Sequence, residues 1–324
     1  MLGFAHVHAP GYAACLAAIP DAELVAVADD QPERLAGAVA RFGGEPYDDP
    51  VALLNRDDVE AVIVMAENAR HRELVVAAAA AGKHVLCEKP LATSRADGLA
   101  MVEACRARGV KLGTVFPVRF NPAAVALRRA IQDGAIGKPL AVKATNPGQV
   151  PPGWFTDPAL AGGGAVMDHT VHVADLLRWI FGREIVEVYA EVDTLLHPGL
   201  PVDDVGVLML RLEGGLTASL DASWSRPRTW PNWGGLTMEV VGEGGVIAMD
   251  AFRANLQLVE DRGPSHRLLP WSGGGDVALV EDFMAAVRED RDPLVTGVDG
   301  LRAMEVALCA YESARRHEPV ATAP

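Results

Sequence analysis

Two short stretches of the sequence carry residues that can move a proton. In AGKHVLCEKPLAT (81–93), Lys89 follows a run of β-forming residues, and in GGGAVMDHTVHVADLLRWIFG (162–182) Asp168 and His172 are four residues apart. On a helix this spacing places Asp168 and His172 on one face, a turn from each other. Histidine is suited to general-base catalysis at neutral pH, and a lysine charge can stabilise a developing alkoxide. These residue types fit the removal of a hydroxyl proton while hydride leaves the same carbon.

The opening stretch MLGFAHVHAPGY is a turn of small residues that leads into a helix-like run. A dinucleotide fold binds pyrophosphate over such a first βα turn, where the free N–H groups of a helix start point at the phosphates. Gly3, Ala5 and Ala9 are the expected small residues of this turn. Asp29 follows about 20 residues after Ala9, where a carboxylate accepts hydrogen bonds from ribose hydroxyls and repels a 2′-phosphate. The sequence therefore favours NAD over NADP as the cofactor.

His6 and His8 lie in the same turn and raise the alternative of a metal site. Metal sites built on a His-x-His pair need further ligands at the ends of later strands, and the later part of this chain does not fit a closed (β/α)₈ barrel. We therefore predict that both imidazoles line the nucleotide site and that no metal is bound. Only Met1 and Leu2 precede Gly3, where about four to six strand residues are usual. We expect a curtailed first strand, with the natural start of the chain lying upstream as one explanation.

Strand and helix signals alternate over roughly the first 120 residues, with short connections between them. The apolar runs 61–65 and 84–88 indicate buried strands, and the Ala-rich stretch 71–81 between them indicates a helix. Ser94 is the expected N-cap of a further helix over 94–108. This alternation predicts βαβ units and a parallel, doubly wound sheet.

The pattern changes after residue 120. A strong helix is predicted over 168–181, and alternating strands joined by Gly-rich turns follow over 185–260. Two helices are expected to close the chain. We predict an α/β protein with a Rossmann-like dinucleotide-binding domain over residues 1–119. Residues 120–324 are expected to form an α+β domain with an open, mostly antiparallel sheet that binds substrate and joins subunits.

Composition narrows the possible partners. The 324 residues are 50% apolar and 22% charged, an ordinary balance for a globular protein, and the net charge of −14 argues against nucleic acid or an anionic membrane surface. There is no apolar run long enough for a membrane span and no basic segment typical of a signal peptide. Four scattered cysteines form no zinc or disulfide pattern. We therefore expect reduced cysteines and a cytoplasmic location.

Taken singly, the chemically active residues have simpler explanations. Lys89 could be a solvated turn residue, Asp168 a helix cap and His172 a satisfied core histidine. Taken together, the two stretches and the order of the domains resemble the Gfo/Idh/MocA family, the glucose–fructose oxidoreductases and inositol dehydrogenases. The resemblance extends over essentially the whole chain. It includes FNPAA (120–124), GAIGKPLAV (134–142), DASW (221–224) and the closing stretch 297–320.

The resemblance implies NAD(P)-dependent hydride transfer on a hydroxyl or carbonyl group of a sugar, cyclitol or related polyol. Lys89 matches the lysine of the family's E-K-P segment, while Asp168 and His172 match the first and last residues of its D-x-G-x-H segment. We predict His172 as the general base, Lys89 as stabiliser of the alkoxide or relay of its proton, and Asp168 as a residue that orients the imidazole or binds a substrate hydroxyl. His169 could add a donor to the substrate site or point away from it. A metal held by His169, Asp168 and His172 is disfavoured, because helical spacing suits ligands four residues apart better than neighbours.

Asn68 and His71 match the region that faces the nicotinamide ribose in the family. Two positions depart from the pattern: Thr170 stands where the family often has Gly, and Glu67 replaces a frequent Pro beside Asn68. The Glu67 change is expected to alter cofactor affinity. The predicted cofactor contacts are Gly3, Ala5, His6, His8, Ala9, Asp29, Asn68, His71, Glu88 and Lys89.

Substrate contacts are expected from loops near the start of the second domain. Arg119 and Asn121 would supply polar groups, and Trp154 with Phe155 would supply rings that can stack on a sugar. Further tryptophans could stack in the same way or cover an interface between subunits. The resemblance implies a homodimer or homotetramer that pairs through the C-terminal sheet. These further tryptophans are Trp224, Trp230 and Trp233.

Other functions stay open for this fold. The cofactor could serve redox-assisted elimination or glycoside cleavage, in which product forms with no net change in NADH. The chain could instead be a non-catalytic sugar or nucleotide sensor, which would turn over no polyol. A metal hydrolase is a further alternative, which elemental analysis of the pure protein would test.

Overall fold

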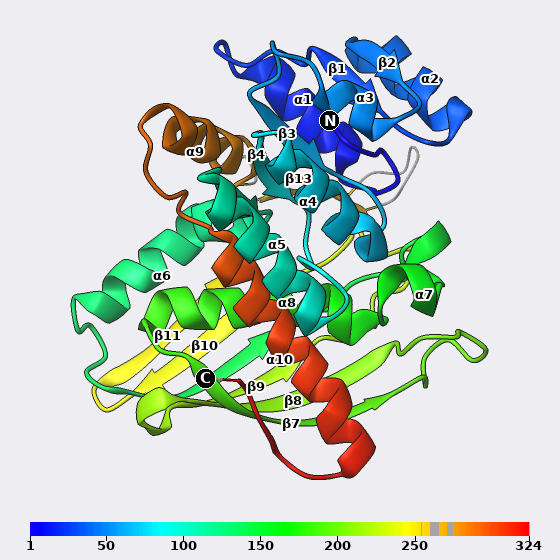
Figure 1. Ribbon diagram of the computed structural model, residues 1–324. Helices are drawn as coiled ribbons and strands as arrows, with labels where there is room; N and C mark the ends of the chain where they lie inside the picture. Colours follow the sequence, from blue (N-terminus) through cyan, green and yellow to red (C-terminus); the bar gives the residue numbers. More distant parts are fainter. Residues whose placement is uncertain (254, 260–265, 271–274, 324) are drawn as a thin grey trace. The chain divides into compact units, whose positions relative to one another are not determined.

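The computed structural model describes residues 1–253, 255–259, 266–270 and 275–323 (Figure 1). The chain forms two compact units. The first unit consists of Met1–Pro117, Ala159–Gly162 and Gly275–Arg302, and the second of Val118–Pro158, Gly163–Gly274 and Ala303–Pro324.

A parallel sheet forms the centre of the first unit. Its described strands run in the order β2, β1, Leu2, β3, β4, β5, and Leu2 forms parallel bridges to Ala28 on one side and Val64 on the other. Leu2 thus stands where a doubly wound dinucleotide-binding sheet has its first strand. That strand is curtailed, as predicted. The strands are β1 (Ala26–Ala28), β2 (Glu45–Tyr47), β3 (Ala61–Val64), β4 (His84–Cys87) and β5 (Leu112–Thr114).

Local signals begin and end the helices between these strands. Ser94 accepts a hydrogen bond from the Asp97 N–H and caps α5, as predicted, and Gly109 ends that helix in the left-handed conformation at φ +66°. Pro32 begins α2 and Gly43 follows its last residue. The helices of the unit are α1 (Ala9–Ala18), α2 (Pro32–Phe42), α3 (Pro50–Leu54), α4 (His71–Ala80), α5 (Arg95–Arg108) and α9 (Asp276–Arg288).

Helix α9 packs in the first unit, whereas the sequence assigned every residue after 119 to the second domain. The Tyr12 hydroxyl in α1 donates to Asp276 Oδ1 over 2.7 Å. The Thr114 N–H at the end of β5 donates to the Val295 carbonyl over 3.4 Å. The two divisions differ because the chain returns to the first unit at Gly275, where α9 covers apolar sheet surface that would otherwise face water.

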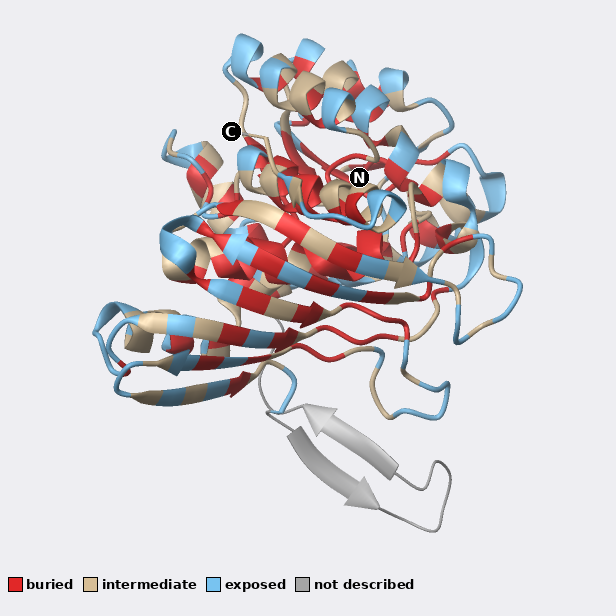
Figure 2. Ribbon diagram, turned by 90° about the horizontal axis from the view of Figure 1, so that it is seen from below, coloured by how far each residue is buried: buried red, intermediate tan, exposed pale blue. Residues whose placement is uncertain are grey.

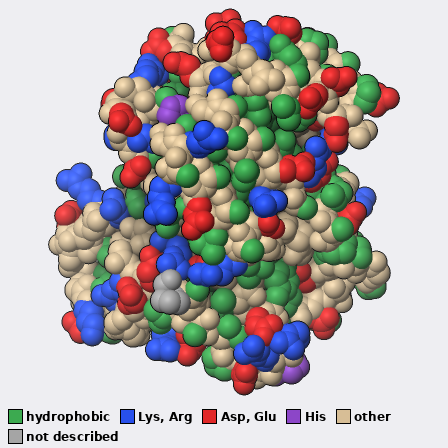
Figure 3. All heavy atoms as spheres, viewed as in Figure 1, with side chains coloured by type: hydrophobic (Ala, Val, Ile, Leu, Met, Phe, Trp, Pro, Cys, Tyr) green, Lys and Arg blue, Asp and Glu red, His purple; other side chains and the backbone are tan. Residues whose placement is uncertain are grey.

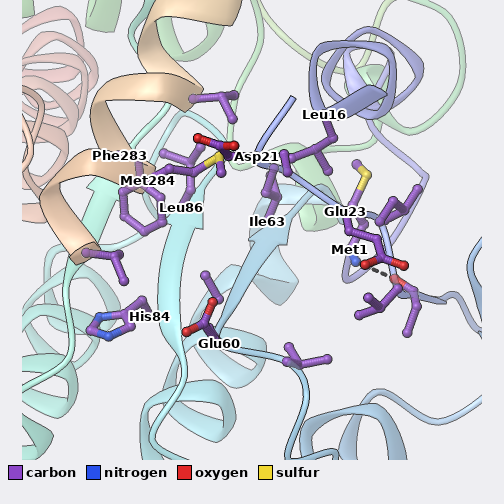
Figure 4. A pocket seen from close by; sticks show the side chains of 18 of the residues that line it. Met1, Leu16, Asp21, Glu23, Glu60, Ile63, His84, Leu86, Phe283 and Met284 are labelled. Carbon is purple, nitrogen blue, oxygen red and sulfur yellow. Dashed lines mark hydrogen bonds between the residues drawn. The ribbon is translucent and has the colours of Figure 1, made fainter. Parts of the chain in front are cut away.

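A cavity of about 700 Å³ lies at the edge of this sheet where the strands begin. Ala26 and Ala61 line it, and Phe283 of α9 forms part of its wall (Figure 4). The Met1 amino group donates to the Ala26 carbonyl over 2.8 Å at this edge. Burial of the amino group lowers its pKa to about 5.

The centre of the second unit is a mixed sheet in the order β11, β10, β6, β9, β8, β7, β14. In the described chain, β6 and β9 are parallel neighbours and the other neighbouring pairs are antiparallel, which confirms the predicted open, mostly antiparallel sheet. The strands are β6 (Pro139–Thr145), β7 (Ile185–Asp193), β8 (Val205–Leu212), β9 (Thr217–Asp221), β10 (Thr237–Gly242), β11 (Gly245–Asp250) and β14 (Val320–Ala321). A separate antiparallel pair consists of β12 (Asn255–Val259) and β13 (His266–Pro270).

The two faces of this sheet differ. Burial alternates along β8 and β9, so that one face packs against helices and the other is exposed (Figure 2). Leu208 and Leu210 point to the buried face, while Val207 and Met209 are about half exposed. The helices of this unit are α6 (Pro122–Gln132), α8 (Ala165–Phe181) and the part of α10 (Gly297–Arg316) that follows Arg302. The short helix α7 (Pro158–Ala161) belongs to the first unit except for Pro158.

The surface charges are mixed. Acidic and basic side chains are interspersed on the face shown in Figure 3. No helix within the described ranges has the length and apolar character needed to cross a bilayer.

Candidate active site

The first βα turn of the first unit is built for a close approach of the backbone. Gly3 has φ +83°, and a Cβ atom there would lie 2.9 Å from the Ala66 backbone, so glycine is required. The Gly3 N–H donates to the Ala28 carbonyl, and the Ala9 N–H donates to the His6 carbonyl. Helix α1 begins at Ala9 with His8 as its N-cap residue. The turn therefore has the short strand-to-helix geometry that binds pyrophosphate in dinucleotide folds.

Asp29 follows β1 at the same edge of the sheet and is 3% exposed. Its carboxylate accepts the Phe4 N–H over 2.7 Å and the Gln31 N–H over 2.8 Å. Arg34 Nε donates to the same carboxylate over 3.0 Å. These bonds fix the carboxylate at the end of the second strand, where dinucleotide folds carry the acidic residue that contacts the ribose.

Glu88 directly follows β4 and brings together the two histidines of the turn. It is fully buried, and its Oε1 atom pairs with His6 Nδ1 at 3.1 Å and with His8 Nδ1. Its Oε2 atom accepts the Lys89 N–H over 2.6 Å. Burial opposes ionisation of Glu88, but the charges of His6, His8 and Lys89 outweigh it and hold the pKa of Glu88 well below its ordinary value.

Asn68 and His71 lie beside this turn, and the side chains of both contact backbone carbonyl groups at hydrogen-bond distance. Asn68 Nδ2 donates to the Ala161 carbonyl over 2.9 Å. The His71 ring is fully buried, with Nδ1 3.0 Å from the Pro90 carbonyl oxygen and Nε2 3.2 Å from that of Ala66. Desolvation by burial lowers the pKa of His71. We revise the role of His71 from a cofactor contact to a residue that holds the 88–91 segment against the end of β3.

Helix α8 of the second unit carries the predicted acid–base residues. Asp168 is 8% exposed, and its Oδ2 atom accepts the Trp224 indole N–H over 3.3 Å. His169 does not point away: its Nε2 lies 3.2 Å from Asp168 Oδ2 and its Nδ1 lies 2.6 Å from the Asn146 carbonyl oxygen. His172 is partly exposed one turn after Asp168. Asp168 is thus held from two sides on the helix that presents His172.

Trp224 belongs to the core, which corrects both roles considered for it. Its side chain is fully buried against Ala165 and Val202, so it neither stacks on a sugar nor covers an interface. Trp230 and Trp233 are about two-fifths exposed and stay available for either role.

The start of α8 is held by two residues far away in the sequence. Asp203 accepts the N–H groups of Gly164 and Val166, each over 2.8 Å, and the Tyr311 hydroxyl donates to Asp203 over 2.8 Å. Cβ atoms at Gly163 and Gly164 would lie 2.2 Å from the Tyr311 hydroxyl and 1.9 Å from the Asp203 carbonyl oxygen. The glycines of GGGAVM therefore allow Asp203 and Tyr311 to cap α8 closely. Sequence reasoning missed both residues, since no local pattern links them to the helix.

Two of the predicted substrate contacts have structural partners. Arg119 is buried and donates from Nε to Asp175 Oδ2 over 2.8 Å, forming an ion pair within the second unit. Asn121 caps α6 through the Ala123 N–H and donates to the Ala251 carbonyl. Both residues thus position elements of the second unit. Trp154 stacks on Phe155 with ring centroids 4.0 Å apart and stays a predicted substrate contact.

Comparison with known proteins agrees with this arrangement. Residues 1–116 match the model of the oxidoreductase family with an NAD-binding Rossmann fold, and residues 124–248 match the GFO/IDH/MocA C-terminal domain. The chain is 33% identical over 305 residues to myo-inositol 2-dehydrogenase of Thermotoga maritima, covering 91% of this chain and 90% of that protein. It is 32% identical to 1,5-anhydro-D-fructose reductase of Ensifer adhaerens over 90% of this chain and 89% of that protein.

Solved structures show the same likeness. GenD2 from gentamicin A biosynthesis, in complex with NAD, superposes with a TM-score of 0.92 at 26% identity, covering 100% of this chain and 95% of that chain. Levoglucosan dehydrogenase, in complex with NADH and levoglucosan, superposes with a TM-score of 0.87 at 25% identity, covering 100% and 98%. With both domain models matched and this likeness over nearly its full length, the chain belongs to the Gfo/Idh/MocA family of NAD-binding oxidoreductases.

Proposed function

We propose that this protein transfers hydride between NAD and a hydroxyl or carbonyl group of a sugar, cyclitol or related polyol. The observation that carries the proposal is α8, on which Trp224 and His169 hold Asp168 one turn before His172. The relatives named for myo-inositol, 1,5-anhydro-D-fructose and levoglucosan support this substrate class.

The first unit has the groups that NAD requires. Gly3 and the small residues after it are proposed to leave room for pyrophosphate at the start of α1, and the Asp29 carboxylate is proposed to accept hydrogen bonds from the ribose hydroxyls. Asn68 and Glu88 lie at the ends of β3 and β4, where the nicotinamide ribose is expected. When bound, NAD supplies the nicotinamide ring that accepts or returns hydride.

Three side chains are proposed to act on the substrate. His172 takes the hydroxyl proton as general base, because imidazole exchanges protons near neutral pH. The ammonium group of Lys89 stabilises the negative charge that develops on the substrate oxygen. Asp168 orients the His172 imidazole or accepts a hydrogen bond from a second substrate hydroxyl, and Trp224 and His169 fix its position. Trp154 is proposed to stack on the sugar ring.

The test is a panel of sugars and cyclitols with NAD and with NADP, followed at the NADH absorbance. We expect turnover with NAD, and a fall in kcat of at least about 100-fold in Lys89→Met and His172→Ala with NADH binding retained. No fluorescence response to NADH up to millimolar concentration would contradict the proposal. Product formed with no net change in NADH would point to redox-assisted elimination, and binding without turnover of any polyol would point to a sensor.

The exposed face of the large sheet is proposed to join subunits into a homodimer or homotetramer. Val207 and Met209 on β8 and Val246 on β11 are about half exposed there, and an apolar sheet face of this kind is typical of an interface. Light scattering after size exclusion tests this, with Met209→Glu expected to dissociate the assembly.

We place the protein in the cytoplasm because its four cysteines, all in described residues, are free thiols.

A further inference from the structure

The side chains of His6, His8 and Glu88 form a group of metal-ligand type in the first unit. His6 Nδ1, His8 Nδ1 and Glu88 Oε1 offer ligand atoms that all lie within 4.8 Å of one another. His6 and Glu88 are buried, whereas the His8 side chain is 41% exposed and gives the group access to solvent. The proposed proton transfer by Lys89 and His172 makes no use of this group.

The fold supplies a third ligand from a distant part of the chain. A His-x-His pair after a first strand needs a further ligand at the end of a later strand to hold a metal. Glu88 directly follows β4, and the carboxyl ends of parallel strands meet at one edge of the sheet. His6 and His8, in the turn after Leu2, lie at that same edge. The three residues are thus brought together by topology, although 80 residues separate His8 from Glu88.

Two short contacts fix the position of His6 Nδ1 within the group. This nitrogen lies 3.2 Å from the His8 backbone nitrogen and 3.1 Å from Glu88 Oε1. The His6 imidazole therefore faces the Glu88 carboxylate, as a ligand that shares a metal ion with it would.

The ligand types and the distance between His6 and Glu88 fit zinc. In a tetrahedral site with bonds of about 2.0–2.2 Å, ligand atoms lie roughly 3.3–3.6 Å apart, and His6 Nδ1 and Glu88 Oε1 are 3.1 Å apart. The Lys89 N–H holds the other carboxylate oxygen of Glu88 over 2.6 Å and so directs Oε1 toward the imidazoles. Two imidazoles and one carboxylate are a common zinc set that leaves a coordination position open.

We propose that His6, His8 and Glu88 bind one divalent transition-metal ion, with zinc as the ion best suited to the ligands, in the cofactor-free protein. The ligands lie in the turn where dinucleotide folds bind pyrophosphate, so an ion held there changes the affinity for NADH. By thermodynamic linkage, NADH must change the affinity for zinc by the same factor.

The first experiment measures metal binding by tag-free, metal-free protein. Zn²⁺ is titrated in competition with a chromophoric chelator, and Co²⁺ is added as a spectroscopic probe of coordination. We expect one ion per chain, a cobalt spectrum typical of four-coordinate sites, and at least a 10-fold loss of Zn²⁺ affinity in Glu88→Gln and in His8→Ser (compare about 10–100-fold for outer-shell changes). Serine keeps an N-cap at the start of α1, and thermal unfolding monitors the fold of each variant.

The matched control is His317→Asn. His317 is exposed and has φ +55°, a conformation that asparagine tolerates well. Zinc affinity should be unchanged in this variant. Equal affinities in the wild type, Glu88→Gln and His8→Ser, or a cobalt spectrum that stays that of the free aqueous ion, would overturn the proposal.

The second experiment tests whether the ion binds at the turn between Leu2 and α1. The NADH dissociation constant is measured by protein fluorescence with and without saturating Zn²⁺, in the wild type and in Glu88→Gln. We expect zinc to change it several-fold in the wild type and to leave it unchanged in Glu88→Gln. A wild-type dissociation constant that does not respond to zinc would put the ion elsewhere and overturn the assignment. The chelator titration needs no substrate, so it stands or fails apart from the proposed dehydrogenase activity.

Discussion

The starts of α1 and α8 look alike in sequence, because each is a turn of small residues that leads into a helix, yet they differ in what holds them. In the described chain, the N-cap side chain of α1, His8, makes no capping hydrogen bond. The first N–H groups of α8 are bound by Asp203 and Tyr311. The start of α1 is therefore suited to an outside anion, whereas that of α8 is used by the protein to hold Asp168 and His172 in place.

Adding one methyl group to each turn should have the largest and most different effects at the two helix starts. In Gly164→Ala the new Cβ would lie 1.9 Å from the Asp203 carbonyl oxygen, a backbone atom that cannot yield. We expect the free energy of unfolding, measured with denaturant, to fall by more than about 4 kcal/mol. The matched change Gly11→Ala in α1 meets no described atom within 4 Å and should stabilise the protein by about 0.5–1 kcal/mol. Similar losses in both variants would contradict the comparison.

A second test uses pH, because the short strand that leads to α1 begins with a buried amine. For a chain whose first residue is Met1, the amino group has a pKa of about 5 when folded and 8.0 when unfolded. Between these values the unfolded chain binds more protons, so stability rises with pH across the window by at most about 4 kcal/mol. Denaturant unfolding from pH 5 to pH 8 measures the slope. An Nα-acetylated protein, which cannot titrate there, should show a shallower slope; equal slopes would count against the assignment.

The third test weakens the capping of α8 without adding atoms. Tyr311→Phe removes the hydroxyl that accepts the N–H groups of Gly164 and Met167 and donates to Asp203. We expect a loss of about 1–3 kcal/mol in unfolding free energy, because these buried groups lose a partner. If the proposed function holds, kcat should fall while the NADH dissociation constant stays unchanged. A weakened NADH affinity would show that the capping also serves the first unit.

The smallest effect is expected at the ligand-facing turn. Asp29→Asn keeps an oxygen that can accept a hydrogen bond and removes the charge, so NADH binding should weaken by roughly 10-fold, in line with a charged hydrogen bond worth about 1.5–3 kcal/mol. NADPH binding should weaken less, because the repulsion of its 2′-phosphate is relieved. Fluorescence titration with both cofactors gives the ratio, and an unchanged ratio would remove Asp29 from cofactor selection.

Local patterns predicted most of the fold correctly. Alternating strand and helix signals gave the parallel sheet, Ser94 gave the start of α5, and apolar alternation gave the strands β7 to β11. Helix α8 begins at Ala165, before the predicted Asp168, because Asp203 caps its first turn from outside. A cap supplied by a distant residue cannot be recognised from the sequence next to the helix.

The candidate site was harder to predict where partners are distant in the chain. The pairings Arg119–Asp175 and Asn121–Ala251 turned predicted substrate contacts into structural ones. Residue type and loop position could not reveal this, because the partners lie more than 50 residues away. Glu88 was predicted as a cofactor contact, but its association with His6 and His8 required the order of strands in the sheet.

The bridge formed by Leu2 has a consequence for how the first unit opens. Strands β2 and β1 are joined to β3, β4 and β5 through the short backbone pairing of Met1 to Gly3, so the sheet should part along this seam before either half unfolds. Native-state hydrogen exchange would then show lower protection for the backbone amides that face the seam than for those between β3 and β4. A ligand that contacts Asp29 on one side and Asn68 on the other would bind only the closed sheet, so NADH should slow exchange along the seam the most. Bound NADH would therefore make the two halves of the sheet unfold cooperatively.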